Sequence, residues 1–132
     1  MNIPSDTLDI VINFIKTRVS DANCEGVVLG LSGGIDSAVT LSLAVKALGP
    51  DKVIGLIMPF NVTESVDLAT NHAKSLSVNT KVIHISGIVS SYKDKSSLFS
   101  EQLSEGNLHS RIRMSLLYGA AFSSNKLVIG TS

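Results

Sequence analysis

The sequence feature that most limits the possible folds is a short apolar run that passes directly into a glycine turn and then into a helical pattern. The run spans 27–31, the turn is Ser32-Gly33-Gly34, and the helical pattern begins at Ile35. An apolar run of this length, bounded by turn residues, is typical of a strand buried on both faces, as in parallel sheets. The sequence therefore indicates a strand–turn–helix unit of an α/β protein.

The glycine turn has the chemistry of an anion site. Gly33 and Gly34 allow backbone conformations closed to other residues and remove side chains that would keep an anion from the main chain. The helix that follows adds unpaired amides and the positive end of its dipole, while Ser32 and Ser37 add hydroxyl donors. We therefore predict a phosphate-binding loop, formed by Gly30, Leu31, Ser32, Gly33, Gly34, Ile35, Asp36 and Ser37.

Asp36 is the one acidic member of this loop. A carboxylate repels a phosphate unless a cation lies between them, so we interpret Asp36 as a ligand for Mg²⁺ brought in by a nucleotide. The alternative is an ordinary aspartate at a helix N-terminus, and the Ser-Gly-Gly context favours the metal role. The pattern G-x-x-x-x-G-K-[ST] is absent, so this is not a Walker A loop.

Composition limits the classes of protein that remain. A chain of 132 residues with 44% hydrophobic content has room for one globular domain, and its 11 basic and 11 acidic residues predict no general attraction to nucleic acid or anionic membranes. No apolar stretch approaches the ~18 residues of a membrane span, and the N-terminus lacks an export pattern. We expect a cytoplasmic location. The single cysteine, Cys24, cannot form an internal disulfide and is interpreted as an incidental thiol.

Helical and strand patterns alternate along the rest of the chain. Helices are expected at about 5–19, 35–48, 66–76 and 110–122, and strands at 27–31, 53–58, 81–85 and 126–129. Because the connections are too long for hairpins, this order predicts an α/β fold: a doubly wound parallel sheet with helices on both faces and about four strands. Ligands of such folds lie at the carboxyl ends of the strands.

The segment from Ser86 to Gly106 departs from this pattern. It is rich in serine, and its apolar residues show only weak periodicity. A connection of this length at the ligand edge is expected to be either a mobile element that covers the substrate or a poorly ordered link.

Two arginines follow that segment, Arg111 and Arg113. Because they are two residues apart, they cannot share one helix face, and we expect them to point to different places. One interpretation is a solvated arginine beside a structural one. The other is that at least one guanidinium holds a phosphate or carboxylate, for which its two-pronged geometry is suited.

Taken together, these motifs resemble a known family. The pattern S-G-G-x-D-S is similar to the signature of the ATP pyrophosphatases, or PP-loop enzymes, which split ATP between the α and β phosphates. Further blocks, in the same order and approximate spacing, resemble the ammonia-dependent NAD synthetases over essentially the whole chain. These blocks are Met58-Pro59, G-N-L-H-S-R-I-R-M at 106–114 with L-L-Y at 116–118, and L-V-I-G-T-S at 127–132.

The resemblance implies a reaction and the residues for it. ATP would adenylate the nicotinate carboxylate of deamido-NAD, and ammonia would then displace AMP to give NAD. By resemblance, Gly30 to Ser37 and Thr131 would bind ATP, Asp36 would bind Mg²⁺, and Arg111 would contact deamido-NAD. The family is generally homodimeric, so a homodimer is expected. No catalytic side chain is required, and the three histidines are interpreted as surface or packing residues.

The resemblance also implies residues that lie beyond Ser132, including an acidic metal ligand. We expect residues 1–132 to be a single PP-loop nucleotide-binding domain shortened at its C-terminus, which binds ATP weakly and does not make NAD. We expect no glutaminase domain before Met1, so ammonia would come from solution or from another protein. The alternatives are another PP-loop adenylating ligase, such as a GMP synthetase or a tRNA-modifying enzyme, and a non-catalytic nucleotide-binding module.

Overall fold

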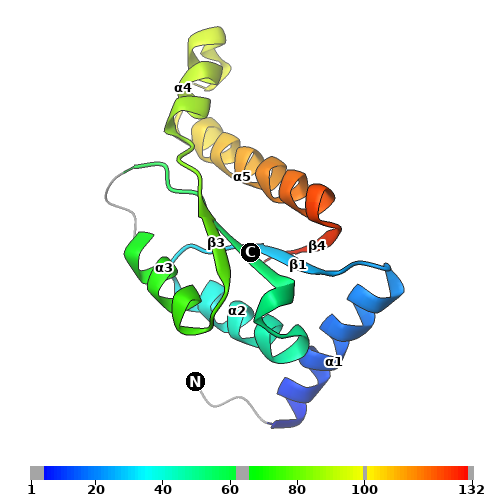
Figure 1. The fold of residues 1–132 in the computed structure, drawn as a ribbon. Helices are drawn as coiled ribbons and strands as arrows, with labels where there is room; N and C mark the ends of the chain where they lie inside the picture. Colours follow the sequence, from blue (N-terminus) through cyan, green and yellow to red (C-terminus); the bar gives the residue numbers. More distant parts are fainter. Residues whose placement is uncertain (1–4, 62–65, 100, 131–132) are drawn as a thin grey trace.

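Four parallel strands lie between two layers of helices in the computed structural model, which describes residues 5–61, 66–99 and 101–130 (Figure 1). The strand order is β3-β2-β1-β4, which confirms the predicted doubly wound α/β fold. Short 3₁₀ turns lie at Pro50–Lys52 and Ser97–Phe99. In chain order the helices and strands are α1 (Ser5–Asp21), β1 (Gly26–Gly30), α2 (Ile35–Leu48), β2 (Val53–Ile57), α3 (Val66–Ser75), β3 (Asn79–Val82), α4 (Ser86–Lys95), α5 (Gln102–Ser124) and β4 (Lys126–Ile129).

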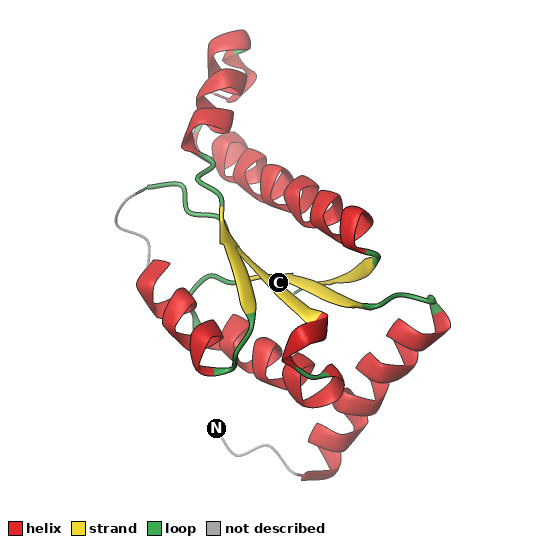
Figure 2. Ribbon diagram, in the orientation of Figure 1, coloured by secondary structure: helices red, strands yellow, loops and turns green. Residues whose placement is uncertain are grey.

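Strand β1 shows how the sequence builds a layer on each face of the sheet. Successive side chains of a strand point to opposite faces, so Val27 and Leu29 face one layer and Val28 faces the other. All three side chains are almost completely buried. The first layer contains α1, α2 and α3, and the second contains α4 and α5, as Figure 2 shows on the two sides of the strands. The unbroken apolar run at 27–31 follows from burial on both faces.

The order of the strands fixes where a ligand can bind. From β1 the chain adds β2 and then β3 on one side, and β4 then pairs with the other side of β1. In an open parallel sheet, the place where the order reverses leaves a crevice at the carboxyl ends of the strands. Here that place lies between β1 and β4, and the loop that follows β1 opens onto it.

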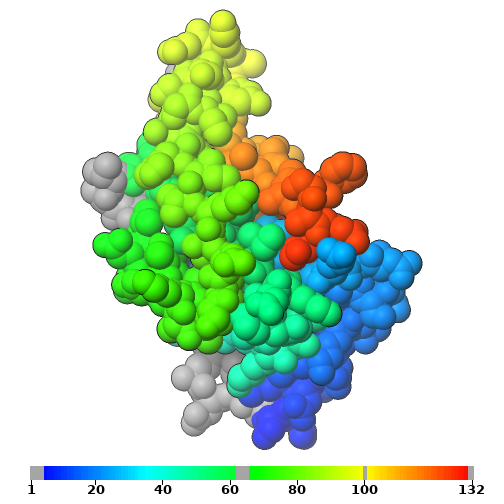
Figure 3. All heavy atoms as spheres, in the orientation of Figure 1, coloured from blue at the N-terminus to red at the C-terminus, as the bar shows by residue number. Residues whose placement is uncertain are grey.

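Most of the segment 86–106 is helical, so the expectation of a poorly ordered link was wrong, and the alternative of a mobile element that covers the substrate stays a prediction. Helix α4 occupies Ser86–Lys95 and α5 begins at Gln102, before the expected start at 110. In Figure 1, α4 projects away from the sheet beyond the start of α5, and Figure 3 shows it as a protrusion from the body. A projecting helix needs few buried residues. Val89 is buried whereas Tyr92 is exposed, which explains the weak apolar periodicity.

The third strand lies two to three residues earlier than expected, at Asn79–Val82. Its backbone hydrogen bonds to β2 and to the residues just after β2 nevertheless continue through the predicted range. The amide of Ile83 donates to the carbonyl of Ile57 at 2.8 Å, and that of Ile85 donates to Pro59 at 3.0 Å. The strand is at the sheet edge and mostly exposed, so its sequence lacks a clear alternation.

A close backbone approach ties the start of β1 to the turn before β2. A Cβ added at Gly26 would lie 1.9 Å from the carbonyl oxygen of Lys52. Glycine is therefore required at the first residue of this strand.

In the described part of the chain, no helix has both the length and the apolar character to cross a membrane.

Candidate functional site

The loop between β1 and α2 lies at the carboxyl edge of the sheet, as predicted. The amide of Leu31 donates to the carbonyl of Leu56 at 2.8 Å, so the sheet bonding continues one residue past β1. Gly33 then has a φ of 82°, a left-handed conformation that favours glycine. Gly34 has φ −82° and ψ 168° and directly precedes α2, without a side chain that caps the helix. The turn therefore directs the chain straight into the helix.

Two serine hydroxyls hold this loop together. The Ser37 hydroxyl donates to the carbonyl of Gly34 and accepts from the amide of Ser32, each at 3.2 Å. The Ser32 hydroxyl lies 3.2 Å from that of Ser37 and accepts from the amide of Gly34, also at 3.2 Å. Ser37 is only 5% exposed, whereas Ser32 is exposed. Ser37 thus braces the loop from inside, and Ser32 faces solvent.

The first turn of α2 supplies the free donors. The amide of Ala38 is bonded to the carbonyl of Gly34 at 3.1 Å, and this bond closes the first helical turn. The amides of Ile35, Asp36 and Ser37 precede it, in the part of a helix where amides have no carbonyl partner within the helix. These amides carry the positive end of the helix dipole, which favours an anion at this position.

Asp36 lies in that first turn with an exposed side chain, and its carbonyl accepts a hydrogen bond from the hydroxyl of Thr40 at 2.9 Å. Within the described ranges there is no group of three or more His, Cys, Asp or Glu side chains that could hold a metal ion. A single carboxylate fits Mg²⁺ delivered with a nucleotide, because that ion is commonly held by one or two carboxylates together with phosphate oxygens and water. It does not fit an ion held by protein side chains alone.

The two arginines of α5 point to different places, as predicted. Nε of Arg113 donates to the carbonyl of Met58 at 2.9 Å, which ties α5 to the end of β2. Nε of Arg111 donates to Oδ1 of Asn107 at 3.3 Å, and the Arg111 side chain is exposed. Arg113 therefore has the structural role, and Arg111 leaves most of its donors available.

Arg111 borders an open groove of about 180 Å³ between α4 and α5. Sequence reasoning did not find this groove, because it depends on α4, which was not predicted. Its other wall includes the ring of Tyr92, which meets Phe99 edge to face with 5.9 Å between ring centroids. The groove combines apolar walls with one guanidinium, a composition suited to an aromatic compound that bears an anionic group.

The histidines have packing roles or are exposed, as expected. The His109 ring stacks on Phe60 with 4.2 Å between centroids, and its Nε2 lies 3.8 Å from Oε1 of Glu105. His84 is exposed. His72 is partly buried beside the phosphate loop, and its Nε2 donates a hydrogen bond to the carbonyl oxygen of Ala38 at 3.2 Å. Thr131, the remaining residue expected at the ATP site, lies outside the described residues.

The strand order and the Ser-Gly-Gly loop at the switch point define an α/β protein of the PP-loop class. The family model described as NAD synthase matches residues 7–132. An NH(3)-dependent NAD(+) synthetase of Thermococcus sibiricus is 43% identical over 122 residues, which cover 92% of this chain and 48% of that protein. The chain belongs to the NAD synthase family.

Solved structures agree with this assignment. An NH3-dependent NAD synthetase from Campylobacter jejuni has a TM-score of 0.91 and 37% identity, covering 97% of this chain and 56% of that one. An NMN synthetase from Francisella tularensis has a TM-score of 0.89 and 32% identity, covering 100% of this chain and 56% of that one. The chain spans about half the length of the curated relatives that it matches.

Proposed function

We propose that this chain forms the ATP-binding half of an ammonia-dependent NAD synthetase. In the proposed reaction, a carboxylate oxygen of deamido-NAD attacks the α-phosphorus of ATP and pyrophosphate leaves. Ammonia then attacks the activated acyl carbon, AMP leaves, and NAD is formed. The observation that supports this most directly is the place of the phosphate loop, whose unpaired first-turn amides lie at the switch point of a PP-loop fold.

ATP is proposed to bind along residues Gly30 to Ser37, with Thr131 as a further contact. The first-turn amides of α2 would bind phosphate oxygens, and the exposed Ser32 hydroxyl is the one that can turn toward a ligand. The buried Ser37 hydroxyl would keep the loop in shape. Fixed donors of this kind need no rearrangement as charge develops on the leaving pyrophosphate.

Asp36 is the proposed protein ligand for Mg²⁺. When bound with ATP, the ion would neutralise charge on the departing phosphates. The chain's own contribution is to place one carboxylate in the first turn of α2, beside the amides that face the phosphates. The carboxylate would then be paired with a cation rather than left to repel the nucleotide.

Arg111 and the groove between α4 and α5 are proposed to hold the acceptor. The guanidinium is suited to a phosphate or carboxylate of deamido-NAD, and the Tyr92 ring to one of its aromatic rings. The Francisella relative is named an NMN synthetase, so a mononucleotide acceptor is the comparison to make. The Thermococcus and Campylobacter proteins favour the dinucleotide.

A homodimer is also proposed, supported by large apolar side chains that are exposed on α5. Leu103 is 86% exposed, Tyr118 61% and Phe122 93%. Tyr118 and Phe122 are four residues apart and share one face of α5, and an exposed apolar face of this kind usually marks an interface. Light scattering should give twice the chain mass, and the variant Phe122→Glu should give a monomer. A cytoplasmic location is proposed in addition, which agrees with a sequence that has only Cys24 and so no internal disulfide.

The test is the exchange of labelled pyrophosphate into ATP. The protein would be residues 1–132 joined to the second half of the Thermococcus sibiricus relative, with Arg111→Met as a matched variant. We expect exchange that requires deamido-NAD, and NAD formation when ammonia is added. Exchange that requires a mononucleotide, a purine nucleotide or tRNA instead would assign the chain to another ligase. ATP binding without exchange in this fusion would favour a non-catalytic nucleotide-binding module.

A further inference from the structure

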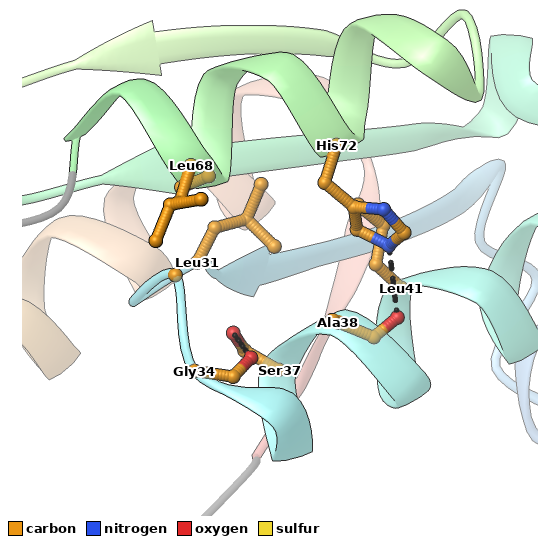
Figure 4. A pocket seen from close by; sticks show the side chains of 9 residues that line it. Leu31, Gly34, Ser37, Ala38, Leu41, Leu68 and His72 are labelled. Carbon is orange, nitrogen blue, oxygen red and sulfur yellow. Dashed lines mark hydrogen bonds between the residues drawn. The ribbon is translucent and has the colours of Figure 1, made fainter.

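A small pocket of about 30 Å³ lies between the phosphate loop and α3 (Figure 4). Leu31 and Gly34 line it from the loop, Ala38 from α2, and Leu68 and His72 from α3. The His72 ring projects from α3 across the pocket toward the first turns of α2. The lining is mainly apolar, and of its two polar side chains Ser37 is already bonded to the loop, so the imidazole is the one that needs an explanation.

That explanation is a hydrogen bond between the two helices. Nε2 of His72 lies 3.2 Å from the carbonyl oxygen of Ala38. A carbonyl oxygen only accepts, so Nε2 bears the proton and donates. The donor and acceptor are 34 residues apart in sequence, so the bond joins α3 to a distant turn rather than extending its own helix.

From Ala38 the bonding continues into the phosphate loop. The amide of Ala38 donates to the carbonyl of Gly34 at 3.1 Å, and the amide of Gly34 donates to the Ser32 hydroxyl at 3.2 Å. Three hydrogen bonds therefore connect His72 to Ser32 by way of the backbone of Ala38 and Gly34, although each of these two residues accepts and donates through different peptide groups. The link is mechanical: the bond to α3 restrains Ala38, and Ala38 in turn restrains Gly34 at the start of α2.

We propose that His72 is a positioning residue for the phosphate loop, acting through Ala38 and Gly34 to hold the first-turn amides of α2 toward a phosphate group. This inference rests on the proposed function, and it assigns to α3 a role that the motif Ser32–Ser37 does not contain. Without the imidazole donor, the helix still forms and the pocket still packs, but the first turn loses its link to α3.

The test compares three variants of this chain for binding of Mg²⁺·ATP and of inorganic pyrophosphate by calorimetry. His72→Leu removes the donor and places an apolar side chain in an apolar pocket, so stability in urea should be unchanged. His72→Gln keeps an amide donor. Asn71→Leu is the matched control, because it makes a similar change at an exposed position of the same helix. A direct measurement on the unmodified chain is the ¹⁵N spectrum of His72, which reports the proton-bearing nitrogen.

We expect His72→Leu to raise the dissociation constants of both ligands by about 3- to 10-fold, because a first turn that is no longer held by α3 has to be ordered when the phosphate binds. His72→Gln and Asn71→Leu should stay close to the unmodified chain, and the proton should be on Nε2. Equal binding by His72→Leu, or a proton found on Nδ1 alone, would overturn the role of His72. If the unmodified chain binds neither ligand, the proposed ATP site itself fails, which is a separate result. If His72→Leu does not fold, the ¹⁵N spectrum and His72→Gln still decide.

Discussion

The two arginines of α5 should separate stability from ligand binding when each is replaced by methionine. Methionine keeps an unbranched side chain but removes every donor. Arg113→Met removes a hydrogen bond of 2.9 Å from a guanidinium to the carbonyl of the buried residue Met58. Hydrogen bonds that involve a charged group contribute about 1.5–3 kcal/mol, and the unpaired carbonyl adds to the loss. Arg111→Met removes a bond of 3.3 Å at an exposed position and should change stability by less than about 0.5 kcal/mol.

Urea unfolding followed by circular dichroism measures this difference. With a slope of about 1.5 kcal/mol per molar urea, Arg113→Met should lower the midpoint by about 1 to 2 M and Arg111→Met by less than about 0.3 M. Binding should show the reverse order, with deamido-NAD affinity reduced mainly by Arg111→Met. Equal shifts of the two midpoints, or a larger shift for Arg111→Met, would refute the assignment of Arg113 to the fold and of Arg111 to the ligand.

Three further predictions concern packing and the metal. Gly26→Ala places a methyl group against the Lys52 carbonyl and should lower the free energy of unfolding by at least about 2–3 kcal/mol. Gly119→Ala adds a methyl group in open space inside α5 and should raise that free energy by about 0.5–1 kcal/mol; thermal unfolding measures both. Leu29→Ala should lower the free energy of unfolding measured in urea by about 2–5 kcal/mol, because the side chain is fully buried. A decrease below about 1 kcal/mol would contradict a sheet whose central strand is covered on both faces. In the absence of Mg²⁺, Asp36→Asn should bind ATP more tightly than the unmodified chain, and adding Mg²⁺ should increase the affinity of this variant for ATP only slightly. If the affinity of the variant depends on Mg²⁺ as strongly as that of the unmodified chain, Asp36 is not the Mg²⁺ ligand.

The sequence predicted those parts of the fold in which a local residue pattern is compatible with only one structure. The run at 27–31 is apolar at every position because β1 is covered on both faces, and this predicted a central parallel strand. Gly33 and Gly34 predicted a turn in backbone conformations closed to other residues; Gly33 has such a conformation with a φ of 82°, whereas Gly34 is extended with a φ of −82°. The separation of Arg111 from Arg113 followed from helix geometry and is confirmed by their different hydrogen-bond partners.

The remaining features depend on contacts between distant segments, which no local pattern contains. Helix α4 buries Val89 but projects from the sheet, so its sequence resembles a polar link. The groove beside Arg111 exists only because that helix packs against α5. The bond from His72 to Ala38 joins residues far apart in sequence, and a lone histidine in an amphipathic helix gives no sign of it.

The serine pair of the loop has a consequence for how a ligand leaves as well as for how it enters. Because the Ser37 hydroxyl bonds to the backbone of the loop itself, the shape of the turn does not depend on an anion being present. An arriving phosphate would meet a backbone turn that is already formed, and only the Ser32 hydroxyl would have to turn, so the order gained on binding would be small. A departing pyrophosphate would likewise leave behind a folded turn, ready for the next nucleotide without a refolding step.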